Sequence, residues 1–146
     1  ESLGASYVAE NGREQKPVMI HRAILGSFER FVGIMTEQFQ GAFPTWLAPV
    51  QAQVLPLSDK FIDYGQKVAN ELKAANIRVE VDQRNETLQA KIRDATLQKI
   101  PYILVVGSKE QEATSVAVRT RDGKDQGAQL IDKFKKTILE EIERKA

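Results

Sequence analysis

The sequence of 146 residues has no cysteine and only one histidine, His21. The absence of cysteine excludes disulfide bonds and cysteine-ligated zinc within these residues. A Ser–His–Asp hydrolase or a self-contained zinc enzyme would have to rely on His21. No apolar run approaches the ~20 residues that span a bilayer, and no signal-peptide pattern opens the chain. We therefore expect no membrane partner and a cytoplasmic location.

An excess of charge of one sign is also lacking, because 21 basic side chains face 20 acidic ones and leave a net charge of +1. This balance excludes a histone-like coat of positive charge, so any nucleic acid must be recognised locally and by shape. Hydrophobic residues make up 42% of the chain, which is typical of a folded globular protein. The length suffices for one domain with a real core.

The first region, residues 1–46, predicts a hairpin followed by a helix. Residues 5–10 and 16–22 are the expected strands, and Asn11-Gly12 supplies the turn signal. A helix is expected from Ser27, its N-cap, to Gly41. Apolar side chains recur along it at spacings of three and four, which is typical of an amphipathic helix.

The second region, residues 47–146, alternates strand and helix patterns. Strands are expected at residues 50–57, 77–81, 100–106 and 115–120, with a turn at Asp122-Gly123. Helices are expected at residues 58–76, after Asn85, and at 130–144, with Ser58 and Asn85 as N-caps. Short strand–helix–strand connections favour parallel pairing by right-handed crossovers. We therefore predict a three-layer α/β domain with a mixed sheet of about five strands.

Taken without any family, the chemical signals are weak. His21 lies in an expected strand, where a packed or exposed strand histidine is the simplest interpretation. Between Lys91 and Lys124 seven basic residues stand against four acidic ones. Asn85, Lys99 and Glu110 fall near the ends of expected elements, where α/β sheets present ligand contacts. Such groups can read the edges of bases, and the alternative is a solvated charged face with ordinary helix caps.

A family resemblance adds to this reading. The stretch PVMIHRAILGSFERF at residues 17–31 resembles class II motif 3 of threonyl-tRNA synthetases, and the likeness continues through FPTWLAPVQ at residues 43–51. It resumes at RNE (84–86), KIR (91–93), PY (101–102), Gly107, KE (109–110) and VAVRT (116–120). The resemblance therefore covers essentially the whole chain. The first block is long and specific, and the later ones are short but in the expected order.

The resemblance implies two parts. Residues 1–46 resemble the end of a class II catalytic core, which activates threonine with ATP and magnesium, and residues 47–146 resemble an anticodon-binding domain. Arg30 corresponds to the motif 3 arginine that packs on the adenine of ATP, a task that suits a planar guanidinium. His21 corresponds to one of three zinc ligands. The other two would lie upstream of Glu1, so the resemblance implies no zinc, no ATP and no catalysis for this chain alone.

The resemblance also implies the base-reading positions. They map onto Asn85, Lys99, Glu110 and Arg119. Lys99 stands where related bacterial enzymes have arginine, and it keeps the charge but loses the two-pronged donor geometry. The implied activity is that of a threonine–tRNA ligase, homodimeric as a whole enzyme, which binds the anticodon loop of threonine tRNA and no DNA.

Two alternatives remain open at the level of sequence. One is a stand-alone RNA-binding or regulatory module derived from an anticodon-binding domain. The other is a protein-interaction module with the same fold but without RNA binding. The motif 3 block favours the ligase, because an independent RNA module has no reason to retain that strand and helix.

Overall fold

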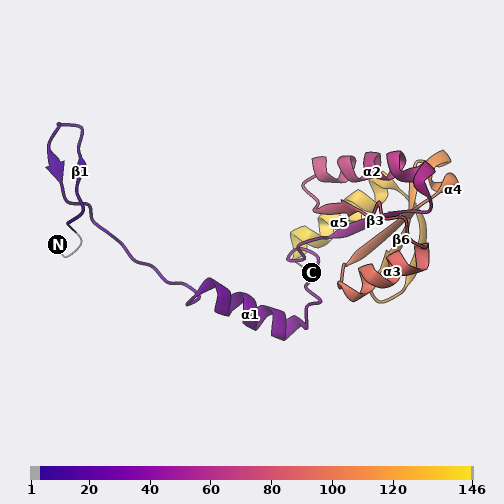
Figure 1. Ribbon diagram of the computed structural model, residues 1–146, viewed down its shortest axis with the longest axis horizontal. Coiled ribbons are helices and arrows are strands. Elements are labelled where there is room, and N and C mark those ends of the chain that lie inside the picture. The colour runs from indigo at the N-terminus through magenta and orange to yellow at the C-terminus, as the bar shows by residue number, and fades with distance from the viewer. Residues whose placement is uncertain (1–3, 146) are drawn as a thin grey trace. The chain divides into compact units, whose positions relative to one another are not determined.

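The computed structural model describes residues 4–145, and its contacts divide the chain into two compact units with the division between Ile34 and Met35 (Figure 1). The boundary expected from the resemblance lies further along, between residues 46 and 47. It stays a prediction, because it concerns which residues correspond to each of two enzyme domains, and contacts within the chain do not test that correspondence.

The first unit contains a short hairpin. Strand β1 (Tyr7–Val8) pairs antiparallel with β2 (Glu14–Gln15), and the turn is closed by a 2.8 Å hydrogen bond from the Gly12 amide to the Ala9 carbonyl. The predicted strand at residues 16–22 is wrong, because no strand forms there. In the observed register the residue opposite Ala5 would be Pro17, which has no N–H to donate to a ladder.

Helix α1 (Phe28–Phe39) begins as predicted. The Ser27 hydroxyl accepts a 3.2 Å hydrogen bond from the Arg30 amide, which is the expected N-cap interaction. The helix ends where Gln40 and Gly41 adopt positive φ angles of 50° and 76°. The division between the two units falls within this helix, and none of its residues is buried.

The second unit is built on a five-stranded mixed sheet in the order β4-β3-β5-β6-β7. The strands are β3 (Ala52–Pro56), β4 (Val79–Val81), β5 (Tyr102–Val106), β6 (Ser115–Thr120) and β7 (Asp125–Leu130). Strand β3 pairs in parallel with β4 and β5, whereas β6 pairs antiparallel with β5 and with β7. This confirms the predicted mixed sheet and the turn at Asp122-Gly123, where the Gly123 amide donates to the Thr120 carbonyl at 2.9 Å.

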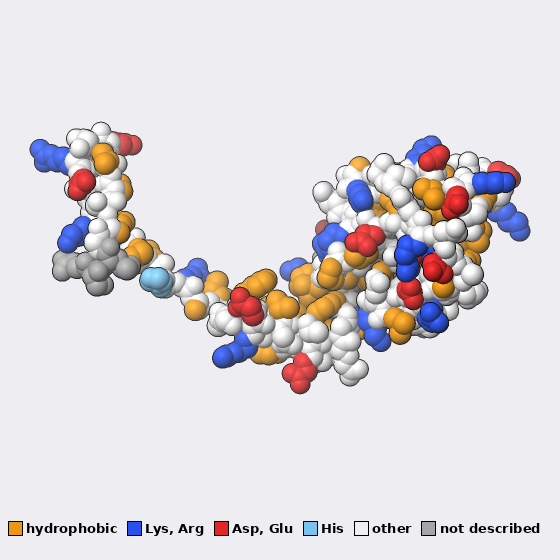
Figure 2. Space-filling view, in the orientation of Figure 1, with side chains coloured by type: hydrophobic (Ala, Val, Ile, Leu, Met, Phe, Trp, Pro, Cys, Tyr) orange, Lys and Arg blue, Asp and Glu red, His pale blue; other side chains and the backbone are white. Residues whose placement is uncertain are grey.

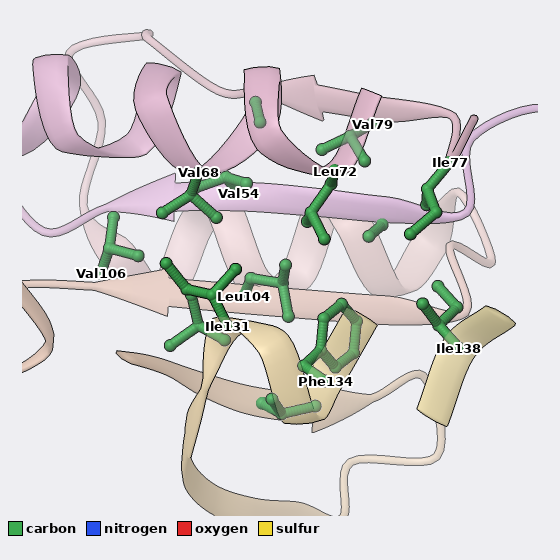
Figure 3. Packing of buried hydrophobic residues seen from close by; sticks show 14 of the residues in the cluster. Val54, Val68, Leu72, Ile77, Val79, Leu104, Val106, Ile131, Phe134 and Ile138 are labelled. Carbon is green, nitrogen blue, oxygen red and sulfur yellow. The ribbon is translucent and has the colours of Figure 1, made fainter. Parts of the chain in front are cut away.

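Helices cover both faces of this sheet and complete three layers. Helices α2 (Ile62–Ala74) and α5 (Ile131–Arg144) pack on one face, and α3 (Leu88–Leu97) packs on the other. Figure 3 shows Val68 and Leu72 of α2 and Phe134 of α5 converging on the apolar side chains of β3 and β5. The smaller core under α3 includes Leu55 and Ala95. Period-two alternation along β3, β5 and β6 supplies apolar side chains to both cores.

Three local details differ from the sequence-based expectations. The cap of α3 is Thr87, whose hydroxyl accepts from the Ala90 amide at 3.3 Å; the prediction of Asn85 was wrong, because a loop continues past it. Ser58 precedes a short 3-10 helix η1 (Asp59–Phe61), and its side chain makes no capping hydrogen bond. A short helix α4 (Ser108–Glu112) was not predicted, because one turn is too short to show periodicity.

Residues 43–48, the entering segment, precede the first strand of the second unit and are held to the rest of that unit by hydrogen bonds. Arg121 Nη1 donates to the Phe43 carbonyl at 2.6 Å. Arg78 donates to the carbonyls of Trp46 and Ala48 at 2.8 and 2.9 Å. Two guanidinium groups thus satisfy the backbone of a segment that has no regular structure. Within residues 4–145, no helix combines the length and apolar character needed to cross a membrane.

Candidate nucleic-acid interface

Asn85 and Glu110 lie at the carboxyl edge of the parallel strands. Asn85 is exposed in the loop that connects β4 to α3, and Glu110 lies in α4, directly after β5. The carboxyl ends of parallel strands in α/β sheets are the usual position of ligand contacts. The topology therefore places these two predicted residues at a suitable edge.

The Glu110 carboxylate is positioned by the start of α4. Its Oε2 atom accepts a 3.0 Å hydrogen bond from the Gly107 amide, and the side chain is half-buried. An acidic side chain in the first turn that bonds back to the N-cap amide is half of a capping box. The Glu110 carbonyl accepts from the hydroxyl of Tyr64 at 3.1 Å, so α4 is also held from α2. Burial, followed by the charge of Glu110, raises the pKa of Tyr64.

Lys99 and Arg119 lie toward the opposite edge. Lys99 is exposed after the end of α3, with a left-handed φ of 60°, and it precedes β5. Arg119 pairs in register with Ile103 near the start of β5. Because Ile103 belongs to the core under α3, the Arg119 side chain is on the α3 side of the sheet. Five residues of β5 separate the two edges, roughly 16 Å at strand spacing.

Arg119 is oriented by a partner on the neighbouring strand. Its Nη2 atom donates to Asp125 Oδ2 at 2.9 Å. Asp125 is itself fixed by the Gly127 amide, which donates to Oδ1 at 2.8 Å. That backbone hydrogen bond, with a smaller effect of Arg119, holds the pKa of Asp125 below its ordinary value. The guanidinium is thus directed by an exposed ion pair and keeps further donors for a ligand.

The four predicted residues therefore do not form one cluster. Asn85 and Lys99 lie in the two connections at opposite ends of α3, Arg119 lies on the α3 side of the sheet, and Glu110 lies at the edge of the sheet. Such a spread does not suit a single small ligand. It suits separate bases of a single-stranded loop, each of which meets its own polar group.

The basic surplus expected between residues 91 and 124 is partly neutralised. Lys91 is only 5% exposed, and its Nζ atom donates to the Asp82 carbonyl at 3.2 Å. Arg119 is paired with Asp125. Figure 2 shows basic and acidic side chains interspersed over the visible face of the second unit. The surface therefore offers individual oriented cations rather than a continuous positive field.

Arg84, the first residue of the RNE motif at residues 84–86, is a further ordered cation. Its Nε and Nη2 atoms donate to Asp82 at 3.0 and 2.7 Å, and Nη1 donates to Asp94 at 3.0 Å. About half of the side chain stays exposed. The spacing of Asp82 and Arg84 was the only sequence signal for this pair. The pair stiffens the loop from which Asn85 projects.

The first unit contains the other two predicted residues. His21, the pale-blue side chain in Figure 2, is exposed and lies in no strand or helix. Arg30 is exposed in the first turn of α1. Among residues 4–145, no three His, Asp or Glu side chains come together as metal ligands. The described residues therefore do not fit a zinc ion on their own, since such sites take three or four protein ligands.

Comparison with known proteins decides the family. A family model described as "Anticodon binding domain" matches residues 51–141, which is more than half of the chain. This chain belongs to the anticodon-binding domain family. The match begins just before β3 and ends within α5, so the anticodon-binding domain coincides with the five-stranded sheet and its helices.

Curated relatives extend the similarity over both units. The threonine–tRNA ligase of Marinobacter nauticus is 54% identical over 98% of this chain, and that of Legionella pneumophila (strain Corby) is 57% identical over the same share. The chain spans 22% of the length of each relative. The likeness therefore includes the hairpin and α1 in addition to the anticodon-binding domain.

Solved structures agree with this fold. The RNA-binding domain of threonyl-tRNA synthetase from Cryptosporidium parvum Iowa II matches with a TM-score of 0.76 and 34% identity, over 90% of this chain and 33% of that chain. Histidyl-tRNA synthetase from Nostoc sp. PCC 7120 matches over 63% of this chain and 22% of that chain, with a TM-score of 0.59 and 19% identity. The second likeness concerns the fold alone.

Proposed function

We propose that this chain is part of a threonine–tRNA ligase and that its second unit binds the anticodon loop of threonine tRNA. The observation that carries the proposal is the extent of the similarity. Relatives named threonine–tRNA ligase match 98% of the chain at 54–57% identity, including the residues before the anticodon-binding domain. A stand-alone RNA-binding module would need only the second unit.

In this proposal the four polar residues divide the work of base recognition. The Asn85 amide offers both donors and acceptors at the carboxyl edge, and the Glu110 carboxylate accepts from base amino or imino groups. Arg119 supplies an oriented guanidinium, and Lys99 supplies a positive charge without the paired N–H donors of a guanidinium. Base-edge contacts would give specificity, whereas contacts of exposed cations with phosphates would position the loop.

The first unit contributes to the catalytic part of the same enzyme in this proposal. Arg30 would stack on the adenine of ATP, whose phosphates bind magnesium, and His21 would be one of the zinc ligands. The remaining ligands would come from other parts of the ligase, because the described residues provide no three-ligand cluster. Zinc, when bound, would supply a direct ligand contact to the threonine hydroxyl, a group that valine lacks. The proposed ligase is a cytoplasmic homodimer.

Binding of the chain to a threonine tRNA anticodon stem-loop tests the proposal. We expect the wild-type chain to bind this hairpin more tightly than one with a changed anticodon. Asn85→Ala and Arg119→Ala should each weaken binding by about 1–3 kcal/mol, because each removes a base contact. Fluorescence anisotropy at fixed salt provides the measurement.

Two matched variants serve as controls for that test. Asn70→Ala and Arg144→Ala remove the same side-chain types from exposed positions on α2 and α5, which cover the other face of the sheet. Neither should change the affinity. Equal affinity of the wild type for both hairpins, or equal losses in the control variants, would refute the assignment.

The assignment of His21 as a zinc ligand is tested in the whole ligase. In that enzyme His21→Ala should lower the bound zinc from stoichiometric to trace levels, because a three-ligand site does not tolerate loss of one ligand. Metal analysis of the purified enzyme measures this. Full zinc content in the variant would remove His21 from the ligand set.

A further inference from the structure

A polar groove lies beside α3, along strand β4. It encloses about 560 Å³, and its lining includes Gln53 of β3, Glu80 of β4, Asp82, Arg84 and Gln98. All of these residues belong to the second unit. The core under α3 joins that helix to β3 and β5, so the groove on the β4 flank lies on the opposite side of α3 from Arg119 on β6. The groove therefore lies apart from Arg119, whereas its lining residues Arg84 and Gln98 directly precede Asn85 and Lys99.

The side chain of Gln53 is the unusual feature of this groove. It is 8% exposed, and its Oε1 atom is buried without a hydrogen-bond partner among residues 4–145. Leaving a buried amide oxygen unsatisfied is energetically unfavourable. A group that donates to this oxygen would recover that cost, so the groove selects for a hydrogen-bond donor.

Glu80 places a second acceptor next to Gln53. The two residues pair in register on adjacent parallel strands, so their Cα atoms are about 4.8 Å apart and their side chains leave the same face of the sheet. Gln53 is two residues from Leu55, which belongs to the core under α3, and this fixes which face that is. Glu80 is exposed, and among the described residues no cation pairs with it. An amide oxygen and a carboxylate therefore stand side by side.

The remaining charges of the groove neutralise one another. Arg84 bonds to both Asp82 and Asp94, and the ammonium of Lys91 lies against the Asp82 carbonyl. Arg93 also pairs with Asp94, at 3.9 Å. Among the charged residues that line the groove, Arg84 is paired with Asp82, and the charge of Glu80 is left unpaired. The groove combines a net negative charge with paired acceptors, which disfavours a phosphate or a second carboxylate.

We propose that this groove binds a guanidinium group, with Gln53 Oε1 and the Glu80 carboxylate as its two acceptors. A guanidinium carries several N–H donors in a planar fork, which suits two neighbouring oxygens better than the compact ammonium of lysine. The source is a small guanidinium compound or an arginine side chain of a protein. The proposal is independent of RNA binding.

Titration of the 15N-labelled full chain with methylguanidinium, followed by NMR, tests the proposal. We expect saturable shifts of the Gln53 side-chain amide and of the Glu80 backbone amide. N-methylurea, a neutral compound of similar shape, should produce no saturable shift, and methylammonium should bind more weakly. Absence of saturation by methylguanidinium, or equal binding of N-methylurea, would overturn the proposal.

Variants show whether both acceptors are used. Glu80→Gln should weaken methylguanidinium binding about tenfold, the equivalent of about 1.4 kcal/mol, whereas Glu143→Gln at an exposed position of α5 should leave it unchanged. Gln53→Met keeps the length of the side chain and removes the unsatisfied oxygen, so it should weaken binding without lowering stability. Unchanged affinity in either groove variant would contradict the assignment.

Two peptides distinguish a small guanidinium compound from an arginine side chain as the source of the bound group. Acetyl-Gly-Arg-Gly-amide should bind at the same resonances as methylguanidinium, and its lysine counterpart should bind more weakly. An arginine peptide that binds much more tightly than methylguanidinium would identify a protein side chain as the source, and equal affinities would identify a small compound. An arginine peptide that shifts other resonances instead would refute the groove as an arginine site.

Discussion

At the residue scale, Asp82 is the side chain on which the β4–α3 loop depends. It is 6% exposed, and its two oxygens accept hydrogen bonds from the Arg84 amide and guanidinium. These bonds, led by the side-chain contact with Arg84, hold the pKa of the Asp82 carboxyl below its ordinary value of 3.8. A buried carboxylate of this kind is tolerated because it is fully hydrogen-bonded and paired.

The lowered pKa predicts how Asp82→Asn depends on pH. The folded state favours the charged form, so the contribution of Asp82 to stability is present above the ordinary pKa and lost as the pH falls through the folded-state pKa. At about pH 7 the variant should lose about 1–3 kcal/mol of unfolding free energy, because an amide cannot replace the charge-assisted bonds. As the pH falls below 3.8 and through the lowered folded-state pKa, the difference from wild type should shrink.

Urea unfolding from neutral to acid pH provides this measurement. Asp63→Asn, at an exposed position of α2, is the matched control and should follow the wild type throughout. A loss of the same size at every pH would show that Asp82 acts through packing rather than through its charge.

At the scale of elements, Gly65 determines how closely α2 approaches β3. A Cβ atom built there would lie 3.2 Å from Pro56 Cγ and 3.4 Å from Val54 Cγ1, so the helix backbone nearly contacts the strand's side chains. Gly65 faces the same core as Val68 and Leu72. The glycine is required here by close approach and not by its φ angle.

A large side chain at this position should therefore separate helix and strand. Gly65→Leu should lower the free energy of unfolding by about 1–3 kcal/mol, the usual cost of overpacking a core. Thermal or urea unfolding measures the loss. Lys67→Leu, which adds the same side chain at an exposed position of the same helix, should have little effect. Similar stability of the two variants would show that α2 has room to move away from the sheet.

At the scale of the whole second unit, Glu141 of α5 joins three parts of the chain. Its Oε1 atom accepts from the Thr45 hydroxyl at 2.5 Å, and its Oε2 atom accepts from the Tyr102 hydroxyl of β5. Burial, and then the bond to Glu141, raises the pKa of Tyr102 well above its ordinary value of 10.0. One carboxylate thus connects the entering segment, the central sheet and the last helix.

Removal of that carboxylate should loosen the entering segment. Glu141→Ala leaves the hydroxyls of Thr45 and Tyr102 without their acceptor, and Thr45 is only 3% exposed. We expect a loss of about 1–3 kcal/mol in unfolding free energy. Amide exchange at Leu47 and Ala48, which donate to the Pro44 carbonyl, should also become faster.

The exposed Glu143→Ala variant on the same helix is the control, and it should retain wild-type exchange. Faster exchange confined to α5, with Leu47 and Ala48 unchanged, would show that Arg78 and Arg121 hold the segment without help from Glu141.

Local patterns predicted most of the elements because the responsible forces act over a few residues. Apolar periodicity identified the long helices and the buried strands, and Ser27 was identified as a cap from its side chain and position. Local signals failed where the local structure depended on which other residues paired with the segment or continued the loop. No strand formed at residues 16–22, because Pro17 has no N–H to donate to a strand opposite it. The helix after β4 was capped by Thr87 instead of Asn85.

The alternation of strands and helices and, through the sequence motifs, the family of the second unit can be predicted from the amino-acid sequence. Those properties follow from side-chain periodicity and from residue identity along the chain. The surroundings of each polar group, such as the burial of Lys91 and the pairing of Arg119 with Asp125, depend on contacts in the folded chain and could not be predicted. The tertiary structure alone placed Gln53 beside Glu80 in one groove, because strand register joins residues that are distant in sequence.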